Sequence, residues 1–368
     1  MKKVVTIGGA MHDIFLESNH TQAMHLDAPD QQQQSYIVLQ EGKKIEVDAI
    51  SHHLGGGALN SAVSFALLGH KVESIFKVGA DTAGKFIQDQ LCAKGVITNN
   101  AIQDSSEPTG TSVIIPCPSG DRAVLIHRGA NRTLALEDIP LKQITVCDQL
   151  YITSLSGSAS RVLPSLVKQA HQSNVSVAIN PGTSQLTTTN IQTLIQALPY
   201  IDIFILNSYE ATLLMSALTQ TATEKQYPCY GHNKLPLPEL LKKPVGMETI
   251  CFTLQGFFAE ILSKGPKIVV VTNGSEGVYA CNSKSIYFHP SEKTNTISTL
   301  GAGDAFGSTF VSYITEGYTV SNALHAGVIN AASVLCSLGS QTGLLTRAQL
   351  EEKYSAPDIT IPQQFPFS

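Results

Sequence analysis

The sequence lacks the marks of several classes of protein. No run of eighteen apolar residues occurs along its 368 residues, so no membrane-spanning helix is expected. The seven cysteines are scattered without a Cys-x-x-Cys pair, which argues against a structural zinc site or a disulfide framework. The net charge of -5 argues against a broad nucleic-acid surface. Because residues 1–9 also lack a signal-peptide pattern, these absences predict a cytoplasmic protein without membrane or nucleic-acid partners.

The chain has instead a regular alternation of strand and helix patterns. Hydrophobic residues make up 43% of it, enough for a sizeable core in one large α/β domain or two smaller ones. Strand patterns at residues 149–153, 175–180 and 201–206 alternate with helical patterns at 159–172 and 190–198. Such alternation is typical of a parallel sheet covered by helices on both faces.

One stretch, from Thr299 to Gly307, combines glycines with a carboxylate at a helix start. A polar, turn-prone run precedes it and apolar residues at helical spacing follow, so Gly301 and Gly303 stand where a loop becomes a helix. Unpaired backbone amides and the positive end of the helix dipole favour an anion there. Asp304 can then take a proton from a hydroxyl that attacks a phosphoryl group. The alternative is that Asp304 is a simple helix-start acid.

The run Gly301-Ala302-Gly303-Asp304-Ala305-Phe306 resembles the C-terminal signature of the ribokinase-like (pfkB) carbohydrate and nucleoside kinases. In that family the aspartate is the catalytic base, which is the role implied for Asp304. The glycine amides form the family's anion hole, which implies this role for Gly301, Ala302 and Gly303. The resemblance implies a doubly wound, mainly parallel α/β sheet with helices on both faces and a small β lid. It also implies transfer of the γ-phosphate of ATP to a hydroxymethyl group of a sugar.

The same resemblance divides the chain into a core, a lid and an insertion. The core is expected at residues 1–15 and 55–368, with parts of 100–130 contributing to the lid. The lid strands are expected at residues 16–54. Residues 218–250 are expected to form an insertion of unknown role. Within the lid, the patterns at 35–40 and 43–48 predict a hairpin joined at Glu41-Gly42. Family members often pair through this lid, so a homodimer is expected.

Four residues are candidates for binding the sugar. Asp13 follows the strand pattern at residues 4–7, and the carboxyl ends of parallel strands are where open α/β sheets bind ligands. The matching family aspartate accepts hydrogen bonds from sugar or ribose hydroxyls. Gly56 and Gly57 allow close approach of the backbone to a ligand, and Asn60 projects from the first turn of the next helix. The alternatives are a turn aspartate and a helix residue that contacts only water.

Six residues are candidates for binding the nucleotide. Asn207 and Glu210 resemble the family's Asn-x-x-Glu, which organises Mg²⁺ and its waters around the phosphates, although the spacing also fits a capping box. Thr272, Gly274 and Gly277 match a glycine motif that contacts ribose and phosphates, although a hairpin turn explains them too. Asn330 matches an asparagine near the base. The cofactors implied are ATP and Mg²⁺, with Glu210 holding the metal through water.

Two departures from known motifs restrict this interpretation. Ser298 stands where many family members carry an aspartate of a potassium site, which weakens the case for a monovalent cation. Residues 79–85 fit a phosphate-binding P-loop until Phe86, which replaces the hydroxyl residue that binds magnesium, so that reading is rejected.

Three rival functions remain open at this stage. A nucleoside kinase of the same fold needs apolar surface for a base, for which the candidates are Phe15, Tyr36, Ile37 and Phe76. A nucleotide- or sugar-binding protein without turnover is disfavoured by the intact Gly-Ala-Gly-Asp. A dinucleotide-dependent oxidoreductase lacks Gly-x-Gly-x-x-Gly after the first strand.

Overall fold

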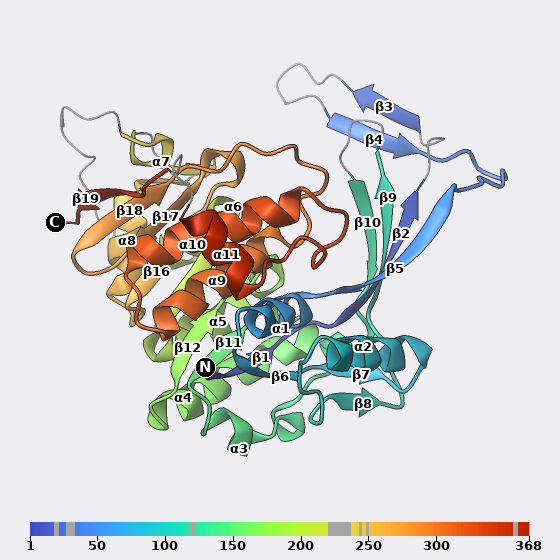
Figure 1. Ribbon diagram of the computed structural model, residues 1–368, viewed down its shortest axis with the longest axis horizontal. Helices are drawn as coiled ribbons and strands as arrows, with labels where there is room; N and C mark the ends of the chain where they lie inside the picture. Colours follow the sequence, from blue (N-terminus) through green and yellow to red (C-terminus); the bar gives the residue numbers. More distant parts are fainter. Residues whose placement is uncertain are drawn as a thin grey trace.

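A nine-stranded sheet forms the centre of the molecule (Figure 1). The computed structural model describes residues 1–17, 22–26, 34–117, 122–219, 237–242, 245–247, 250–355 and 360–367. The sheet order is β19-β18-β17-β16-β13-β12-β11-β1-β6. Its strands are β1 (Lys3–Ile7), β6 (Lys71–Ile75), β11 (Gln149–Ile152), β12 (Ser176–Ile179), β13 (Ile203–Asn207), β16 (Ile268–Thr272), β17 (Val278–Cys281), β18 (Ser285–His289) and β19 (Gln363–Pro366).

The pairing within this sheet is parallel from β6 to β16 and antiparallel from β16 to β19. The sheet is therefore mainly parallel with an antiparallel edge, as the alternation predicted. Adjacent residues point to opposite faces, so Val4 joins one apolar core while Val5 joins the other. A strand buried on both faces reads as a continuous apolar run, which explains the sequence of β16.

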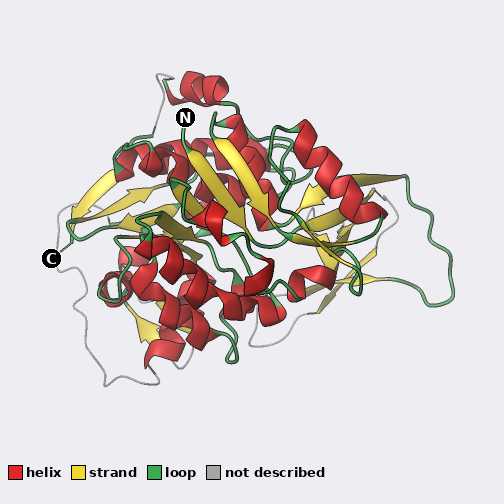
Figure 2. Cartoon of the chain, turned by 90° about the horizontal axis from the view of Figure 1, so that it is seen from below, coloured by secondary structure: helices red, strands yellow, loops and turns green. Residues whose placement is uncertain are grey.

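Helices cover both faces of the sheet, as the view from below shows (Figure 2). One core is closed by α4 (Leu163–Gln172), α5 (Ile191–Ala197), α6 (Ser208–Thr219) and α8 (Leu254–Leu262). The other is closed by α1 (Gly57–Leu67), α2 (Thr82–Ala93), α9 (Ala302–Thr315), α10 (Val320–Leu335) and α11 (Arg347–Tyr354). The predicted fold class is confirmed. No helix in the described ranges is long and apolar enough to cross a membrane.

A second, four-stranded sheet projects from this body as the lid (Figure 1). Its order is β10 (Arg122–His127), β9 (Thr111–Pro116), β2 (Met11–Glu17) and β5 (Ala49–Gly55). A separate hairpin pairs β3 (Gln22–Leu26) with β4 (Gln34–Val38). The first strand of this sheet starts at Met11, and β9 and β10 lie within residues 100–130.

The predicted hairpin between residues 35–40 and 43–48 is wrong in its second strand. Glu41 and Gly42 form a turn, but residues 43–48 are not in a strand. The reason is that β4 takes β3 as its partner and β2 takes β5, which starts at Ala49.

The remaining elements are short. They are the parallel pair β7 (Lys77–Gly79) and β8 (Ile102–Asp104), the pair β14 (Val245–Met247) and β15 (Ile250–Phe252), α3 (Leu141–Ile144), α7 (Glu239–Lys242) and several 3₁₀ turns. Much of the insertion predicted at residues 218–250 lies outside the described residues.

Candidate active site

The start of α9 has the geometry of an anion site. Gly301 caps the helix with φ of 79°, a left-handed conformation, and a Cβ added there would lie 2.5 Å from that of Ser340. Only glycine fits both requirements. At Gly303 a Cβ would meet nothing within 4 Å, so the first turn opens away from the protein. The first amides of a helix have no intrahelical acceptor, so this turn presents donors on its open side.

Asp304 lies in that first turn and is bound by Asn60 of α1. The side-chain amide of Asn60 donates to Oδ2 of Asp304 at 2.8 Å. Burial raises the pKa of the Asp304 carboxyl, and the hydrogen bond from Asn60 opposes this rise. A carboxyl with a raised pKa is a stronger base once ionised, which suits proton abstraction near neutral pH.

Asn60 is itself held by the loop after α10. Its Oδ1 accepts hydrogen bonds from Oγ of Ser340 at 2.8 Å and from Nε2 of Gln341 at 3.0 Å. Because its carbonyl oxygen is occupied, the amide nitrogen of Asn60 faces Asp304. The structure therefore places Asn60 beside the candidate base. Ser340 and Gln341 were not predicted as site residues, and no local signal connects them with Asn60, which is 280 residues away.

Asp13 lies on the lid strand β2, at its junction with the core. Oγ of Ser112, on β9, donates to Oδ1 of Asp13. Burial raises the pKa of the Asp13 carboxyl and this hydrogen bond lowers it. The carboxylate packs over Gly55, where a Cβ would lie 1.9 Å from Oδ2. Gly55 is thus needed to accommodate Asp13, a role that the glycine run alone did not reveal.

Gly56 and Gly57 pack against the protein. A Cβ at Gly56 would lie 2.3 Å from the carbonyl oxygen of Gly9, and one at Gly57 would lie 2.8 Å from Cβ of Thr153. Gly56 also has φ of 91° and precedes α1 as its N-cap. The glycine run predicts that both positions make room for a ligand. In the structure, the space that each Cβ would occupy is filled by residues just after the strands β1 and β11.

Asn207 and Glu210 form a capping box, the alternative that their spacing predicts. The backbone amide of Asn207 donates to Oε2 of Glu210 at 2.9 Å, and the amide of Glu210 donates to Oδ1 of Asn207 at 2.8 Å. Burial raises the pKa of Glu210, and the bond from Asn207 opposes this. Asn207 ends β13 beside Thr272, which ends the neighbouring β16, and Glu210 lies in the first turn of α6. These two bonds pair the backbone N–H groups of Asn207 and Glu210 at the start of α6. They leave Oε1 of Glu210 as an oxygen ligand for a metal or its water.

The glycine motif after β16 splits into two roles. Gly274 has φ of 54° and an open Cβ direction, whereas a Cβ at Gly277 would lie 2.3 Å from the carbonyl oxygen of His289. Gly274 is therefore the member that can face a ligand. At Gly277 the missing Cβ allows close contact with His289, the last residue of β18.

Asn330 is held inside the core. Its side chain is 0% exposed, donates to Oγ1 of Thr309 at 2.7 Å and accepts from the amide of Leu345 at 3.0 Å. Both ends of the amide are thus used within the protein, and the expected place of Asn330 near the base stays a prediction. Its role here is to anchor the segment after α10 to α9.

Ser298 and two of the four apolar candidates are packed within the protein. Ser298 is buried and its hydroxyl accepts from the amide of Leu300 at 3.2 Å, so it shapes the loop before α9. Phe76 is 0% exposed within the core, and Phe15 packs edge-on against His53. Neither phenylalanine therefore offers a free face for a nucleobase.

Comparisons with known proteins agree with this architecture. The model of the pfkB family carbohydrate kinases matches residues 20–233 and 256–347. The ribokinase of Bacillus subtilis (strain 168) is 27% identical over 305 residues, covering 82% of this chain and 87% of that protein. The deoxyribokinase of Salmonella typhimurium is 24% identical over 317 residues, covering 86% of this chain and 92% of that protein.

Solved structures share the fold. Arabidopsis thaliana ribokinase, complexed with ribose and ATP, superposes with a TM-score of 0.74 at 19% identity, covering 96% of this chain and 99% of that one. A chain from E. coli solved with ATP and Mg²⁺ gives a TM-score of 0.72 at 18% identity, covering 96% and 98%. The family match spans well over half of the chain, and the chain therefore belongs to the pfkB family of carbohydrate kinases, phosphotransferases with a ribokinase-like fold.

Proposed function

We propose that this protein transfers the γ-phosphate of ATP to a hydroxymethyl group of a sugar. The observation that carries the proposal is the position of the Asp304 carboxylate beside the open first turn of α9. Asp304 takes the proton of the sugar hydroxyl as its oxygen attacks the γ-phosphorus. The bond from that phosphorus to the β,γ-bridging oxygen breaks, and ADP leaves.

The amides of Gly301, Ala302 and Gly303 stabilise the charge that spreads over the transferred phosphoryl group. Donors fixed before the reaction act strongly here because they need no reorganisation in the transition state. The positive end of the α9 dipole adds to their effect. Asp13, held by Ser112, accepts hydrogen bonds from the sugar hydroxyls and fixes the orientation of the attacking group.

Mg²⁺ fits the nucleotide side of the site by the chemistry of its donors. Mg²⁺ prefers oxygen ligands and keeps several waters, and Glu210 offers a carboxylate oxygen not used by the capping box. Glu210 would hold the ion through water, and the ion would neutralise phosphate charge. The expected position of the nucleotide is beside the open backbone at Gly274 and beside Thr272 and Asn207.

The acceptor in this proposal is a sugar, as in the relatives named ribokinase and deoxyribokinase. Two of the four apolar candidates for a nucleobase surface are packed within the protein, Phe76 in the core and Phe15 against His53, whereas Tyr36 on β4 is 43% exposed. A screen of ribose, deoxyribose, fructose and adenosine for ADP release identifies the acceptor. Release with adenosine alone would contradict the sugar assignment.

Asp304→Asn tests the proposed base. Turnover should fall by about 100- to 10,000-fold, the range that loss of a general base gives, while ATP affinity stays close to that of the parent protein. Asp89→Asn, at an exposed carboxylate on α2, is the matched control and should keep full activity. Normal turnover of the Asp304 variant would show that another group removes the proton.

We also propose a homodimer through the lid. The edge strand β10 exposes apolar side chains, with Leu125 at 61% and Ile126 at 54% exposure. Exposed apolar edge strands favour association with another chain. A second copy supplies an equivalent surface, because a two-fold interface is self-complementary.

A further inference from the structure

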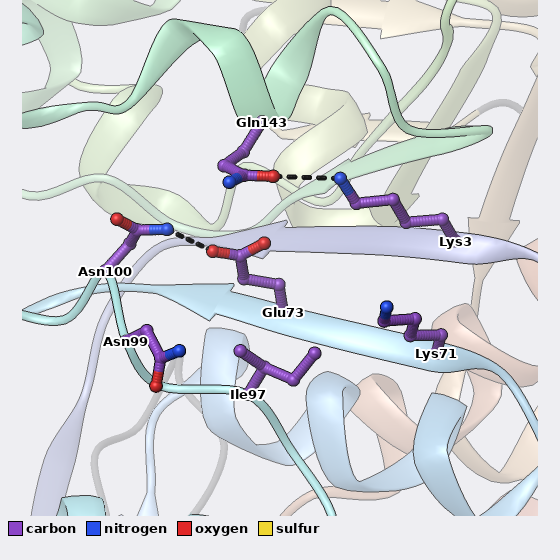
Figure 3. Close-up of a pocket in the computed structure, with 7 residues that line it drawn as sticks. All are labelled: Lys3, Lys71, Glu73, Ile97, Asn99, Asn100 and Gln143. Carbon is purple, nitrogen blue, oxygen red and sulfur yellow. Dashed lines mark hydrogen bonds between the residues drawn. The ribbon is translucent and has the colours of Figure 1, made fainter.

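A pocket lies at the end of the sheet opposite to the active site. Lys3 and Lys71 begin the paired strands β1 and β6, so it lies at the amino ends of strands whose carboxyl ends face the catalytic residues. At about 3.3 Å per residue, the five residues of β1 separate the two edges by roughly 15 Å. The pocket has a volume of about 320 Å³ and is lined by Lys3, Lys71, Glu73, Ile97, Asn99, Asn100 and Gln143 (Figure 3).

Glu73 is the unusual member of this set. It is 5% exposed, on the edge strand β6, and its carboxylate extends toward Asn100, whose amide donates to Oε1 (Figure 3). Among the described residues no cation lies within 4.0 Å of this carboxylate. The neutral amide of Asn100 is the one hydrogen-bond donor to this carboxylate among the described residues. The second oxygen of Glu73 therefore remains available for a donor.

The other polar groups supply both donors and acceptors. Nζ of Lys3 donates to Oε1 of Gln143 at 2.9 Å, which leaves the amide N–H groups of Gln143 free to donate. The amide nitrogen of Asn100 is used by Glu73, which leaves its carbonyl oxygen as an acceptor. Hydroxyl groups both donate and accept, so they match such a lining better than an ammonium group, which only donates.

The charge of the lining points to an anion. Two lysines and one glutamate leave an excess of one positive charge, and Lys71 makes no ion pair with any described residue. Lys71 is also exposed, whereas Glu73 is buried. An incoming ligand would therefore meet Lys71 before it reaches the buried Glu73.

We propose that this pocket is a second ligand site, which binds a small anionic polyol of the sugar phosphate or sugar acid class. Hydroxyls of the ligand donate to Glu73 and to the carbonyl oxygen of Asn100. The phosphate or carboxylate binds the ammonium groups of Lys71 and Lys3. No part of the proposed catalytic machinery is shared, so the site stands independently of the proposed function.

Isothermal titration of the whole protein tests the proposal with four probes: ribose 5-phosphate, gluconate, ribose and inorganic phosphate. One of the two anionic polyols should bind, and which one binds separates a phosphate ester from a sugar acid. In the part of the binding that Lys71→Gln removes, ribose and inorganic phosphate alone should bind at least about tenfold more weakly than the anionic polyol. Absence of binding by either anionic polyol up to about 10 mM, or ribose binding of equal strength that Lys71→Gln and Glu73→Gln also weaken, would overturn the proposal.

Variants then assign the binding to this pocket. Lys71→Gln and Glu73→Gln should each weaken binding at least about tenfold, and Lys71 is exposed, so its variant should fold normally. Lys85→Gln, at an exposed lysine on α2, and Asp13→Asn, in the active site, should leave the affinity unchanged. Binding that survives Lys71→Gln and disappears in Asp13→Asn would place the ligand in the active site and refute the second site.

Discussion

Asn60→Ala should make the enzyme more sensitive to acid. The Asn60 amide donates to Asp304 at 2.8 Å, and this bond favours the ionised carboxylate against the effect of burial. Without the donor, burial acts alone and the pKa of Asp304 rises further. A general base works only when ionised, so the acid limb of the pH–rate profile should move to higher pH.

The magnitude follows from the kind of bond that is lost. A hydrogen bond to a charged group contributes about 1.5–3 kcal/mol, which corresponds to roughly 10- to 100-fold in the ionisation equilibrium. On the acid side of the limb, kcat/KM should therefore fall by about 10- to 100-fold beyond any uniform loss. At high pH, where Asp304 is ionised in both proteins, this additional loss should vanish.

The assay is ADP release measured across pH, with kcat/KM reporting the free enzyme. Gln341→Ala is the graded comparison, because it removes one of the two donors to Oδ1 of Asn60 and keeps the bond to Asp304. Its acid limb should move less than that of Asn60→Ala. A uniform loss of activity in Asn60→Ala, with the limb in place, would show that Asn60 acts only on binding and would refute this reasoning.

Three further outcomes are expected. Asp304→Asn should melt at a higher temperature than the parent protein at pH 8, because burial raises the pKa of the carboxyl and so penalises its charged form. This advantage should shrink as the pH falls to about 4, where the carboxyl of the parent becomes protonated. Thermal melts across this pH range check the sign. Gly301→Ala should lower the free energy of unfolding by about 1–3 kcal/mol in denaturant titrations, since φ is 79° and Ser340 occupies the Cβ space. Leu125→Arg should convert a dimer to monomers in sedimentation velocity, and an unchanged mass would contradict the lid interface.

The sequence predicted those features that depend on local periodicity. The continuous apolar run of β16 and the glycine-to-helix transition at Gly301 each lie within a few residues, so their physics is visible in a short window. Strand pairing in the lid is different. Whether β4 pairs with residues 43–48 or with β3 depends on which strand pairs with β2. A short window of the sequence does not include all the strands that compete for these partners.

The glycines also show what a sequence alone does not reveal. A missing Cβ makes room, but the sequence does not say for what. At Gly303 and Gly274 the room is open, whereas at Gly56, Gly57 and Gly277 it is filled by backbone or side chains of the protein. The contact of Asn60 with Asp304 spans 244 residues, so it could be found only after the chain was folded.

The three carboxylates of the candidate site share one electrostatic situation. Burial raises the pKa of Asp13, Glu210 and Asp304, and in each case one neutral donor opposes it: the hydroxyl of Ser112, the backbone amide of residue 207 or the amide of Asn60. The ionised fraction of each carboxylate therefore depends on a group that need not touch the substrate. Substitutions at Ser112 and Asn60, whose donors are side-chain groups, should alter pH dependence before they alter affinity, which separates positioning from binding.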